Sequence, residues 1–395
     1  MTKVVRRTGG ARRPLPRAVI LFGLVSLLND LSSEMIYPLL PALVTGVLGA
    51  GAAALGALDG GAEFAAAVVK FAAGKLADRT ERRGRLVVLG YAVAVAVRPI
   101  IAAAAAAWQV IGLRVVDRLG KGLRTPPRDA LIADLTPASE RGRAFGVQRG
   151  LDHAGAVLGP VLAWYLLAHH TSVRHVIAAS LIPGLVVLVL AVWAVRAAGT
   201  PEAARNAATP RQRPVAPPVV FGITAFYLLR LPETLIILRA QQLGVAVVVV
   251  PLLWAAVHVV KSATSFAGGH ASDRWGPERT MWGGWVCYAG LAAAMGAAHS
   301  TAAAWALFLA LGVVAGLTEG PERALVARLA GARQGSGFGS YHAVTGLAAL
   351  TGGLGLGLLY EQRGAAIAFF VSAAGGLAVA LVALFSTVRG GRATA

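Results

Sequence analysis

Twelve apolar segments of membrane-spanning length dominate this chain of 395 residues. An α-helix needs about 20 apolar residues to cross the hydrocarbon core of a bilayer. Hydrophobic residues make up 56% of the sequence and charged residues only 14%, which excludes an ordinary soluble domain. The segments lie at about 18–46, 50–76, 85–106, 108–134, 144–168, 175–196, 218–243, 248–272, 279–298, 302–328, 337–361 and 364–388. The sequence therefore predicts an all-α membrane protein with twelve transmembrane helices.

Two short sequences recur about half a chain apart. The sequence at 74–79 has a counterpart at 269–274, 195 residues later, and the sequence at 127–134 has one at 321–328, at an offset of 194. Two unrelated segments would not recur at nearly the same offset by chance. The chain is therefore predicted to contain two pseudo-symmetric six-helix bundles, the arrangement of many secondary transporters.

A polar, proline-rich stretch without a helical apolar pattern lies between the two copies. We expect three parts: an N-terminal six-helix bundle at 1–197, a cytoplasmic linker at 198–217 and a C-terminal six-helix bundle at 218–395.

Positive charge is distributed unevenly between the connections. The formal net charge is +19, but the basic residues alternate with the apolar segments and do not form one basic surface, so we expect no nucleic-acid partner. Counted by side, 22 Lys and Arg lie with the termini, whereas the opposite connections hold only Arg174, Arg239 and Arg363. The positive-inside rule then predicts a multi-pass protein of the cytoplasmic (inner) membrane with both termini cytoplasmic.

Two further features narrow the class. The apolar segment after the basic N-terminal arm continues through Asn29 and Asp30 to Leu48, so we expect a retained first helix rather than a cleaved signal peptide. A single cysteine, Cys287, excludes an internal disulfide framework and a cysteine-based metal site.

The segment Gly74-x-x-x-Asp78-Arg79-x-x-Arg82-Arg83 resembles the signature loop of the major facilitator superfamily, and the resemblance extends over essentially the whole chain. Glu81 stands where the family usually has glycine, whereas the second copy keeps Gly276. The resemblance implies that these loops clamp the two halves together on the cytoplasmic side. The predicted cytoplasmic gate consists of Gly74, Asp78, Arg79, Arg82, Gly269, Asp273 and Arg274. Arg83 and Arg85 are expected to be solvated charges that only fix the topology.

The segment that begins Arg114-Val-Val-Asp117-Arg118 resembles a second family signature, whose arginine the family ties to proton handling. Arg114 and Arg118 share one helical face, and an arginine within a bilayer is costly unless it faces a cavity or a counter-ion. We therefore expect both to point inward. The alternative is a permanent salt bridge from this arginine to an acid on span one or two.

The segment Gly155-Ala-Val-Leu-Gly159-Pro160 resembles the start of the family's exporter signature and predicts a helix-five kink. The paired glycines expected to follow are replaced by Leu162-Ala163-Trp164.

Ionisable residues lie deep in several predicted spans. Acids and bases are balanced there, which predicts mutual pairing around an interior cavity that can load and release a proton. Asp30 and Glu34 are the first choice for that role; the alternative is that they only join helices. The candidates for proton coupling or transport are Asp30, Glu34, Asp59, Glu63, Arg98, Arg114, Asp117, Arg118, Asp152, His153 and Glu233.

The C-terminal half is poorer in charge and is expected to shape the substrate pocket, with Tyr227, Trp254, Phe338 and Tyr341 as candidate lining residues. No nucleophile, base and orienting group occur together, so we expect no enzyme and no cofactor.

These patterns predict a monomeric secondary transporter that moves a small-molecule substrate by alternating access, with proton-coupled export of a small organic compound as the first hypothesis. Two alternatives stay open. One is a divalent metal or organic-ion exporter that uses the acids of spans one and two with His153. The other is a membrane sensor or scaffold that transports nothing.

Overall fold

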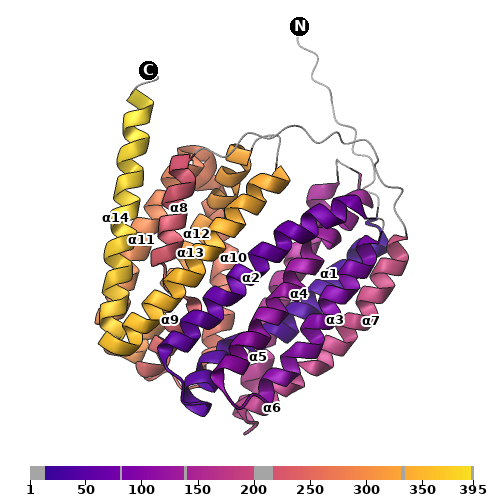
Figure 1. The fold of residues 1–395 in the computed structure, drawn as a ribbon, viewed down its shortest axis with the longest axis horizontal. Helices are drawn as coiled ribbons and strands as arrows, with labels where there is room; N and C mark the ends of the chain where they lie inside the picture. Colours follow the sequence, from indigo (N-terminus) through magenta and orange to yellow (C-terminus); the bar gives the residue numbers. More distant parts are fainter. Residues whose placement is uncertain (1–13, 81, 138–139, 200–216, 331–333, 393–395) are drawn as a thin grey trace.

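The computed structural model describes residues 14–80, 82–137, 140–199, 217–330 and 334–392, apart from the side chains of Lys75, 77–79, 217–220, Arg323, 326–330, 334–340 and 386–392. Within these ranges the chain is helical and contains no strand. The helices before residue 200 lie mostly on the right of the view and those after residue 216 on the left (Figure 1).

Seven helices precede residue 200. They are α1 (Arg17–Glu34), α2 (Ala52–Arg79), α3 (Arg83–Ala102), α4 (Ala107–Asp134), α5 (Arg141–Ala168), α6 (Val173–Ala179) and α7 (Leu181–Ala198). Seven more follow residue 216. They are α8 (Pro217–Leu229), α9 (Glu233–Gln242), α10 (Val250–Trp275), α11 (Pro277–Ala297), α12 (Thr301–Ala330), α13 (Gln334–Arg363) and α14 (Ala365–Arg392). Most of the predicted linker lies outside the described residues.

Ten segments of the described chain are long and apolar enough to cross a membrane, when α6 with α7 and α8 with α9 each count as one span. The two other predicted spans form α4 and α11, helices of 28 and 21 residues. Helix α4 packs against α2 and α3, and α11 packs against α12 and α14. The twelve-span architecture predicted from the sequence is therefore confirmed for the described residues.

Three predicted spans are not continuous helices. After α1 the chain continues through a 3₁₀ turn at Tyr37–Leu39 and a π-helical turn at Ala42–Val47, where Pro38 and Pro41 lack the N–H that a regular helix needs. The seventh span breaks between α8 and α9, where Pro232 precedes the first residue of α9. The sixth breaks at Ser180, between α6 and α7.

The two halves repeat one packing scheme. In the first half α1 packs against α5 and α7, α2 against α4, and α3 against α4 and α7. The equivalent helices of the second half make the corresponding contacts: α8 with α13 and α14, α10 with α12, and α11 with α12 and α14. The predicted pseudo-symmetry is therefore present in the fold.

Helices α2 and α13 form the main contact between the halves, with α5 against α10 as its symmetry counterpart. Glycines bring α2 and α13 close together: a Cβ at Gly353 would lie 2.6 Å from the Gly56 carbonyl oxygen, and one at Gly60 would lie 2.6 Å from the Leu350 Cα. A Cβ at Gly352 or Gly357 of α13 would likewise meet a backbone carbonyl oxygen, that of Leu228 or that of Ala52. Gly355 meets nothing within 4 Å.

A hydrophobic cluster joins both halves at one end of the bundle. It includes Leu40 and Leu55 from the first half and Leu235, Leu253 and Leu356 from the second, all less than 5% exposed. These residues lie near the end of α1, the starts of α2, α9 and α10, and the end of α13. This end is remote from the start of α1 and the end of α14 (Figure 1). The bundle is therefore closed at the end opposite the start of α1 and the end of α14.

Candidate functional site

A buried polar network occupies the interior of the first half. Asp117 of α4 accepts hydrogen bonds from Arg98 Nε at 3.0 Å and from Arg114 Nη1 at 3.1 Å. Arg98 also donates to the carbonyl and side-chain oxygens of Asn29, and Arg124 donates to the same side chain at 3.2 Å. The three arginines and Asp117 are each only 2% exposed. This network holds α1, α3 and α4 together and carries three positive charges against one negative charge.

The salt bridge of Arg114 is to Asp117, three residues further along the same helix. The alternative considered from the sequence, a salt bridge to an acid of span one or two, is not the one formed among the described residues. Arg114 points inward as predicted, and its guanidinium lies over the Tyr37 ring at 5.0 Å. Arg118 is half-buried on the same face of α4.

Asp59 of α2 joins the two halves at the closed end. Its Oδ2 accepts a hydrogen bond from the Thr234 backbone N–H at 3.1 Å and another from the Thr234 hydroxyl at 2.8 Å. Tyr37 donates its hydroxyl to the same carboxylate at 3.1 Å. Thr234 lies in the first turn of α9, whose N-cap, Pro232, makes no side-chain cap. Asp59 thus supplies, from the other half, the acceptor that a helix N-terminus favours.

Glu34, at the end of α1, makes a second contact between the halves. Its Oε2 accepts a hydrogen bond from Trp254 Nε1 of α10 at 2.9 Å and lies 3.9 Å from His258 Nε2. Its Oε1 accepts from Ser33 Oγ at 3.1 Å. The other first-choice acid, Asp30, accepts a hydrogen bond from Asn29 at 2.9 Å, within its own helix. The two acids therefore have different surroundings.

A third contact closes the same end. The backbone N–H of Ala53, at the start of α2, donates to Glu361 Oε2 of α13 at 3.1 Å. Asp59, Glu34 and Glu361 thus accept hydrogen bonds across the halves from neutral donors, which differs from the predicted pairing of acids with bases.

Glu63 of α2 is exposed and interacts electrostatically with Arg118, Lys70 and Lys121. No ion pair at salt-bridge distance joins Glu63, Arg118 or Lys121 to another described residue. Asp152 of α5 lies 3.7 Å from Arg149. Of these charges, Asp152 and Arg149 lie within salt-bridge distance of each other, and Glu63 interacts with its neighbouring cations at longer range.

In the second half, a glutamate is bound by two tyrosines. Glu322 Oε1 accepts a hydrogen bond from the Tyr227 hydroxyl at 2.9 Å and one from the Tyr341 hydroxyl. The Arg230 guanidinium lies over the Tyr227 ring at 6.0 Å. Two of the four predicted pocket aromatics thus hold a carboxylate. A third, Trp254, binds Glu34, and the side chain of Phe338 lies outside the described part.

Glu233, at the start of α9, lies 3.9 Å from Arg230 and 3.7 Å from Lys261. His153 of α5 is exposed. Of the predicted candidates, the described structure brings together Arg98, Arg114 and Asp117 in one cluster. It places Asp59 and Glu34 at the interface between the halves.

The predicted cytoplasmic gate is described only in part. The side chains of Asp78 and Arg79 lie outside the described residues. Arg82, Asp273 and Arg274 are exposed, and none of the three forms an ion pair with a described residue. Neither Gly74 nor Gly269 has an atom within 4 Å of the position a Cβ would take. The gate therefore stays a prediction.

Arg83 differs from its expected role as a solvated charge, because its Nη1 lies 2.6 Å from Asp134 Oδ2, at the end of α4. Arg83, the last residue of the first signature, therefore fastens the start of α3 to Asp134, the last residue of the recurring motif at 127–134.

The glycines of the fifth span pack against α1. A Cβ at Gly155 would meet the Leu27 carbonyl, and one at Gly159 would meet the Leu31 carbonyl. Pro160 is buried within α5, which continues through it. These residues allow two helices to approach closely, and the predicted kink at Gly155, Gly159 and Pro160 stays a prediction.

No group of three or more His, Cys, Asp or Glu residues in the described ranges is arranged to hold a metal ion. Two of the four acids proposed for metal transport have other partners: Asp59 binds Tyr37 and Thr234, and Glu34 binds Trp254.

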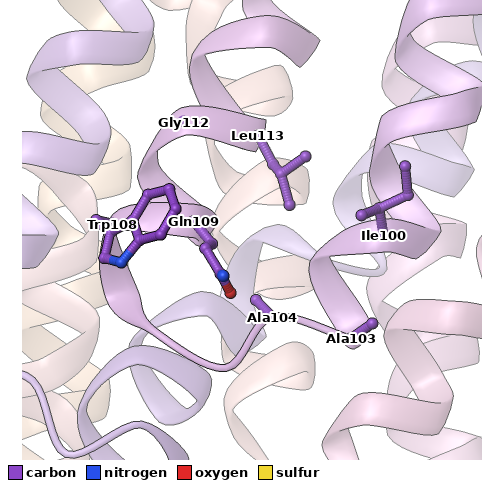
Figure 2. Close-up of a pocket in the computed structure, with 7 residues that line it drawn as sticks. All are labelled: Ile100, Ala103, Ala104, Trp108, Gln109, Gly112 and Leu113. Atoms are coloured by element: carbon purple, nitrogen blue, oxygen red, sulfur yellow. The ribbon is translucent and has the colours of Figure 1, made fainter.

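A pocket of about 430 Å³ lies between the end of α3 and the start of α4 (Figure 2). Its lining is apolar except for Gln109, whose side chain accepts hydrogen bonds from the backbone N–H groups of Ala105 and Ala106. Ile100 and Trp108 on its rim are 52% and 71% exposed. The pocket is therefore part of the outer surface of the first half and lacks the charged groups described above.

Several site residues were missed by reasoning from the sequence. Tyr37 and Thr234 complete the Asp59 contact, and Asn29 and Arg124 complete the buried network. Pro38 and Pro232 were available signals, because each marks a helix break next to one of these residues.

Comparisons with known proteins agree with this architecture. The model of the Major Facilitator Superfamily matches residues 22–238 and 231–394. An uncharacterised MFS-type transporter of Methanocaldococcus jannaschii is 28% identical over 88% of this chain and 90% of its own. Multidrug resistance protein MdtH of Photorhabdus laumondii is 31% identical over 40% of this chain and 38% of its own. The crystal structure of a POT family transporter in complex with 5-aminolevulinic acid superimposes with a TM-score of 0.78, at 11% identity, over 94% of this chain and 96% of that chain.

The family model covers nearly all of the sequence in two matches, one for each half of the fold. The solved structure at 11% identity supports the fold, and the family match identifies a transporter rather than an enzyme. The chain belongs to the Major Facilitator Superfamily and is a multi-pass membrane protein of the secondary-transporter type.

Proposed function

We propose that the protein exports a small organic compound across the cytoplasmic membrane in exchange for protons. The proposal rests on the observation that two carboxylates within the spans, Asp59 and Glu34, each form a polar contact between the halves at the closed end. Protonation of a carboxylate removes its charge and one of its acceptor sites, and thereby weakens such contacts. Proton binding from the outside would then favour the conformation that is open at that end.

The positive-inside asymmetry supports cytoplasmic termini. With that orientation, the end closed by Asp59, Glu34 and the hydrophobic cluster is the outer end. The conformation described here is then closed to the outside, one of the two states that alternating access requires. We propose that the N-terminal bundle at 1–197 and the C-terminal bundle at 218–395 move as the two units and that the protein acts as a monomer.

Export rather than import is supported by two observations. The start of the exporter signature is present at Gly155, Gly159 and Pro160, and Gly155 and Gly159 lie where α5 meets α1. The multidrug resistance protein MdtH is similar over part of the chain.

Purified protein in proteoliposomes with an imposed pH gradient tests this proposal. A mixed panel of organic cations, organic anions, neutral drugs and divalent metals is offered, and gradient-driven movement of at least one organic compound is expected. Glu34→Gln and Asp59→Asn should abolish that movement while the protein stays folded by circular dichroism. Full activity of both variants, or movement of the metals alone, contradicts the proposal. No flux of any compound favours the non-transporting alternative.

A further inference from the structure

Helix α4 carries a row of three cations toward the region between the halves. Arg114, Arg118 and Lys121 are spaced at i, i+4 and i+7, which places them along one side of the helix over two turns. Arg114 is fully buried, and Arg118 and Lys121 are half-buried. The charge of Arg118 is the strongest electrostatic influence on Lys121 and the strongest charged one on Arg114. Like charges at this spacing repel one another in a low-dielectric interior.

The carboxylates near this row do not pair tightly with its two accessible cations. Glu63 of α2 interacts electrostatically with Arg118 and Lys121, and Asp30 and Asp152 interact with Lys121, all beyond salt-bridge distance. Asp117 is shared by Arg114 and Arg98. Glu34, an electrostatic neighbour of Arg118, directs its oxygens to Trp254 and Ser33. Across the described residues, neither Arg118 nor Lys121 has a carboxylate at salt-bridge distance.

Several donors in this row have no hydrogen-bond partner among the described residues. Arg114 Nε and Nη2 and Arg118 Nε are all buried and unpartnered. Asp117 occupies only the Nη1 side of Arg114, so the two unused N–H groups lie together on the other edge of the guanidinium plane. That edge is the fork that receives both oxygens of a carboxylate or two oxygens of a phosphate.

The second half contributes to the same region. His258 Nε2 of α10 is buried without a hydrogen-bond partner and faces Glu34 at 3.9 Å. The rings of Tyr37 and Trp254 lie 5.0 Å apart, and the Tyr37 ring covers Arg114. An aromatic wall therefore stands beside the unused donors, on both sides of the interface between the halves.

We propose that the transported compound is an organic anion whose carboxylate or phosphate group is held by Arg118 and Lys121, with the unused edge of Arg114 at the inner end of the site. This inference rests on the proposed transport function and names its substrate class. Arg118 and Lys121 make the first contact because they are the accessible members of the row. The apolar body of the anion lies against Tyr37 and Trp254.

Binding to the full chain in lipid nanodiscs tests the inference with four probes that share one ring: benzoate, phenyl phosphate, benzyltrimethylammonium and benzyl alcohol. The ionic strength is held constant with chloride, and the saturable rise in unfolding temperature is measured. Benzoate or phenyl phosphate should give a saturable rise, whereas the cation and the alcohol should not. The response to the two anions separates carboxylate from phosphate recognition.

Arg118→Gln should weaken the binding of the responding anion by roughly tenfold or more, because one charge-assisted contact is lost. Lys121→Gln should do the same to a smaller extent, and Arg118→Lys should retain part of the affinity. Arg279→Gln is the matched control: it removes one positive charge from an exposed position on α11 and should leave binding unchanged. If Arg118→Gln does not fold, Lys121→Gln and Arg118→Lys are compared with Arg279→Gln in its place.

No saturable response to either anion, a stronger response to the cation, or unchanged affinity in Arg118→Gln and Lys121→Gln overturns the inference. Flux measurements on the same preparation separate it from the transport proposal. Gradient-driven movement of a cation or neutral compound without anion binding refutes the anion site and leaves transport intact. Anion binding without any pH-dependent movement supports the site and contradicts proton coupling.

Discussion

Replacing Gly353 of α13 with valine should force open the end of the bundle that is closed in this structure. A Cβ at this position would lie 2.6 Å from the Gly56 carbonyl oxygen of α2, whereas ordinary contacts begin near 3.4 Å. The two helices would therefore have to separate by about 0.8 Å. This contact joins the two halves, so the strain can be relieved by moving the halves apart without unfolding either one.

Overpacking of a tight contact costs about 1–3 kcal/mol. A penalty paid only in the closed conformation changes the equilibrium between conformations by the same free energy. Since each 1.4 kcal/mol is a factor of ten, the open population should rise by roughly 5- to 150-fold. Gly355→Val is the matched control, because Gly355 lies on the same helix and a Cβ there would meet nothing within 4 Å.

The rate of cysteine alkylation measures the opening. Leu55 is 0% exposed at the closed end, so a cysteine at this position reacts only when that end opens. The exposed native Cys287 is first replaced by serine. Gly353→Val should accelerate alkylation of Leu55→Cys by the factor given above, and Gly355→Val should not. Equal rates in the two variants would refute the argument that the glycine contact holds this end closed. Gly353→Ala provides a milder form of the test if the valine variant does not insert into the membrane.

Three further predictions concern individual carboxylates. Asp59→Asn and Thr234→Val should each accelerate alkylation at the closed end. Because both substitutions remove the same contact, worth about 0.5–2 kcal/mol, the double variant should show less than the sum of the two effects. Strict additivity would show that the two residues do not act together. Asp117→Asn should destabilise the folded protein by about 3–5 kcal/mol, measured by thermal unfolding in detergent, because two buried arginines lose their shared partner; an unchanged unfolding temperature would contradict this role. Glu34 accepts a hydrogen bond from the Trp254 indole N–H, so Glu34→Gln should change the fluorescence of Trp254. The Trp254 signal is obtained by subtracting the spectrum of the corresponding Trp254→Phe variant. If this signal is the same with and without Glu34→Gln, the contact is not formed.

The number of helices and their pairing could be predicted from the sequence. Membrane spans are recognised by their length and apolarity, and the duplication is recognised by the nearly constant offset between the repeated sequences. Helix α4 was found by the same pattern although its charges make it the least apolar of the spans. Its interior charges are tolerated because Asp117, Asn29 and the carbonyl of Gly90 satisfy much of the arginine hydrogen bonding.

The partners within the candidate site could not be predicted in the same way. The sequence identified Asp59 and Glu34 as costly groups within a bilayer, but their partners Thr234 and Trp254 are 175 and 220 residues away in the chain. Sequence periodicity places a residue on a helix face and says nothing about which distant helix faces it. The helix breaks at Pro38 and Pro232 are local signals, and the second exposes a helix N-terminus that needs an acceptor.

The distance between the halves at the closed end tests most directly whether the protein alternates between two conformations. Val47 and Arg363 are both exposed near that end. Spin labels on cysteines introduced at these two positions, in the Cys287→Ser background and in lipid nanodiscs, report the distance by double electron–electron resonance. We predict two distance populations, with the longer one favoured by acidic pH and by Gly353→Val. A single narrow distance that neither pH nor this substitution changes would contradict alternating access in this protein.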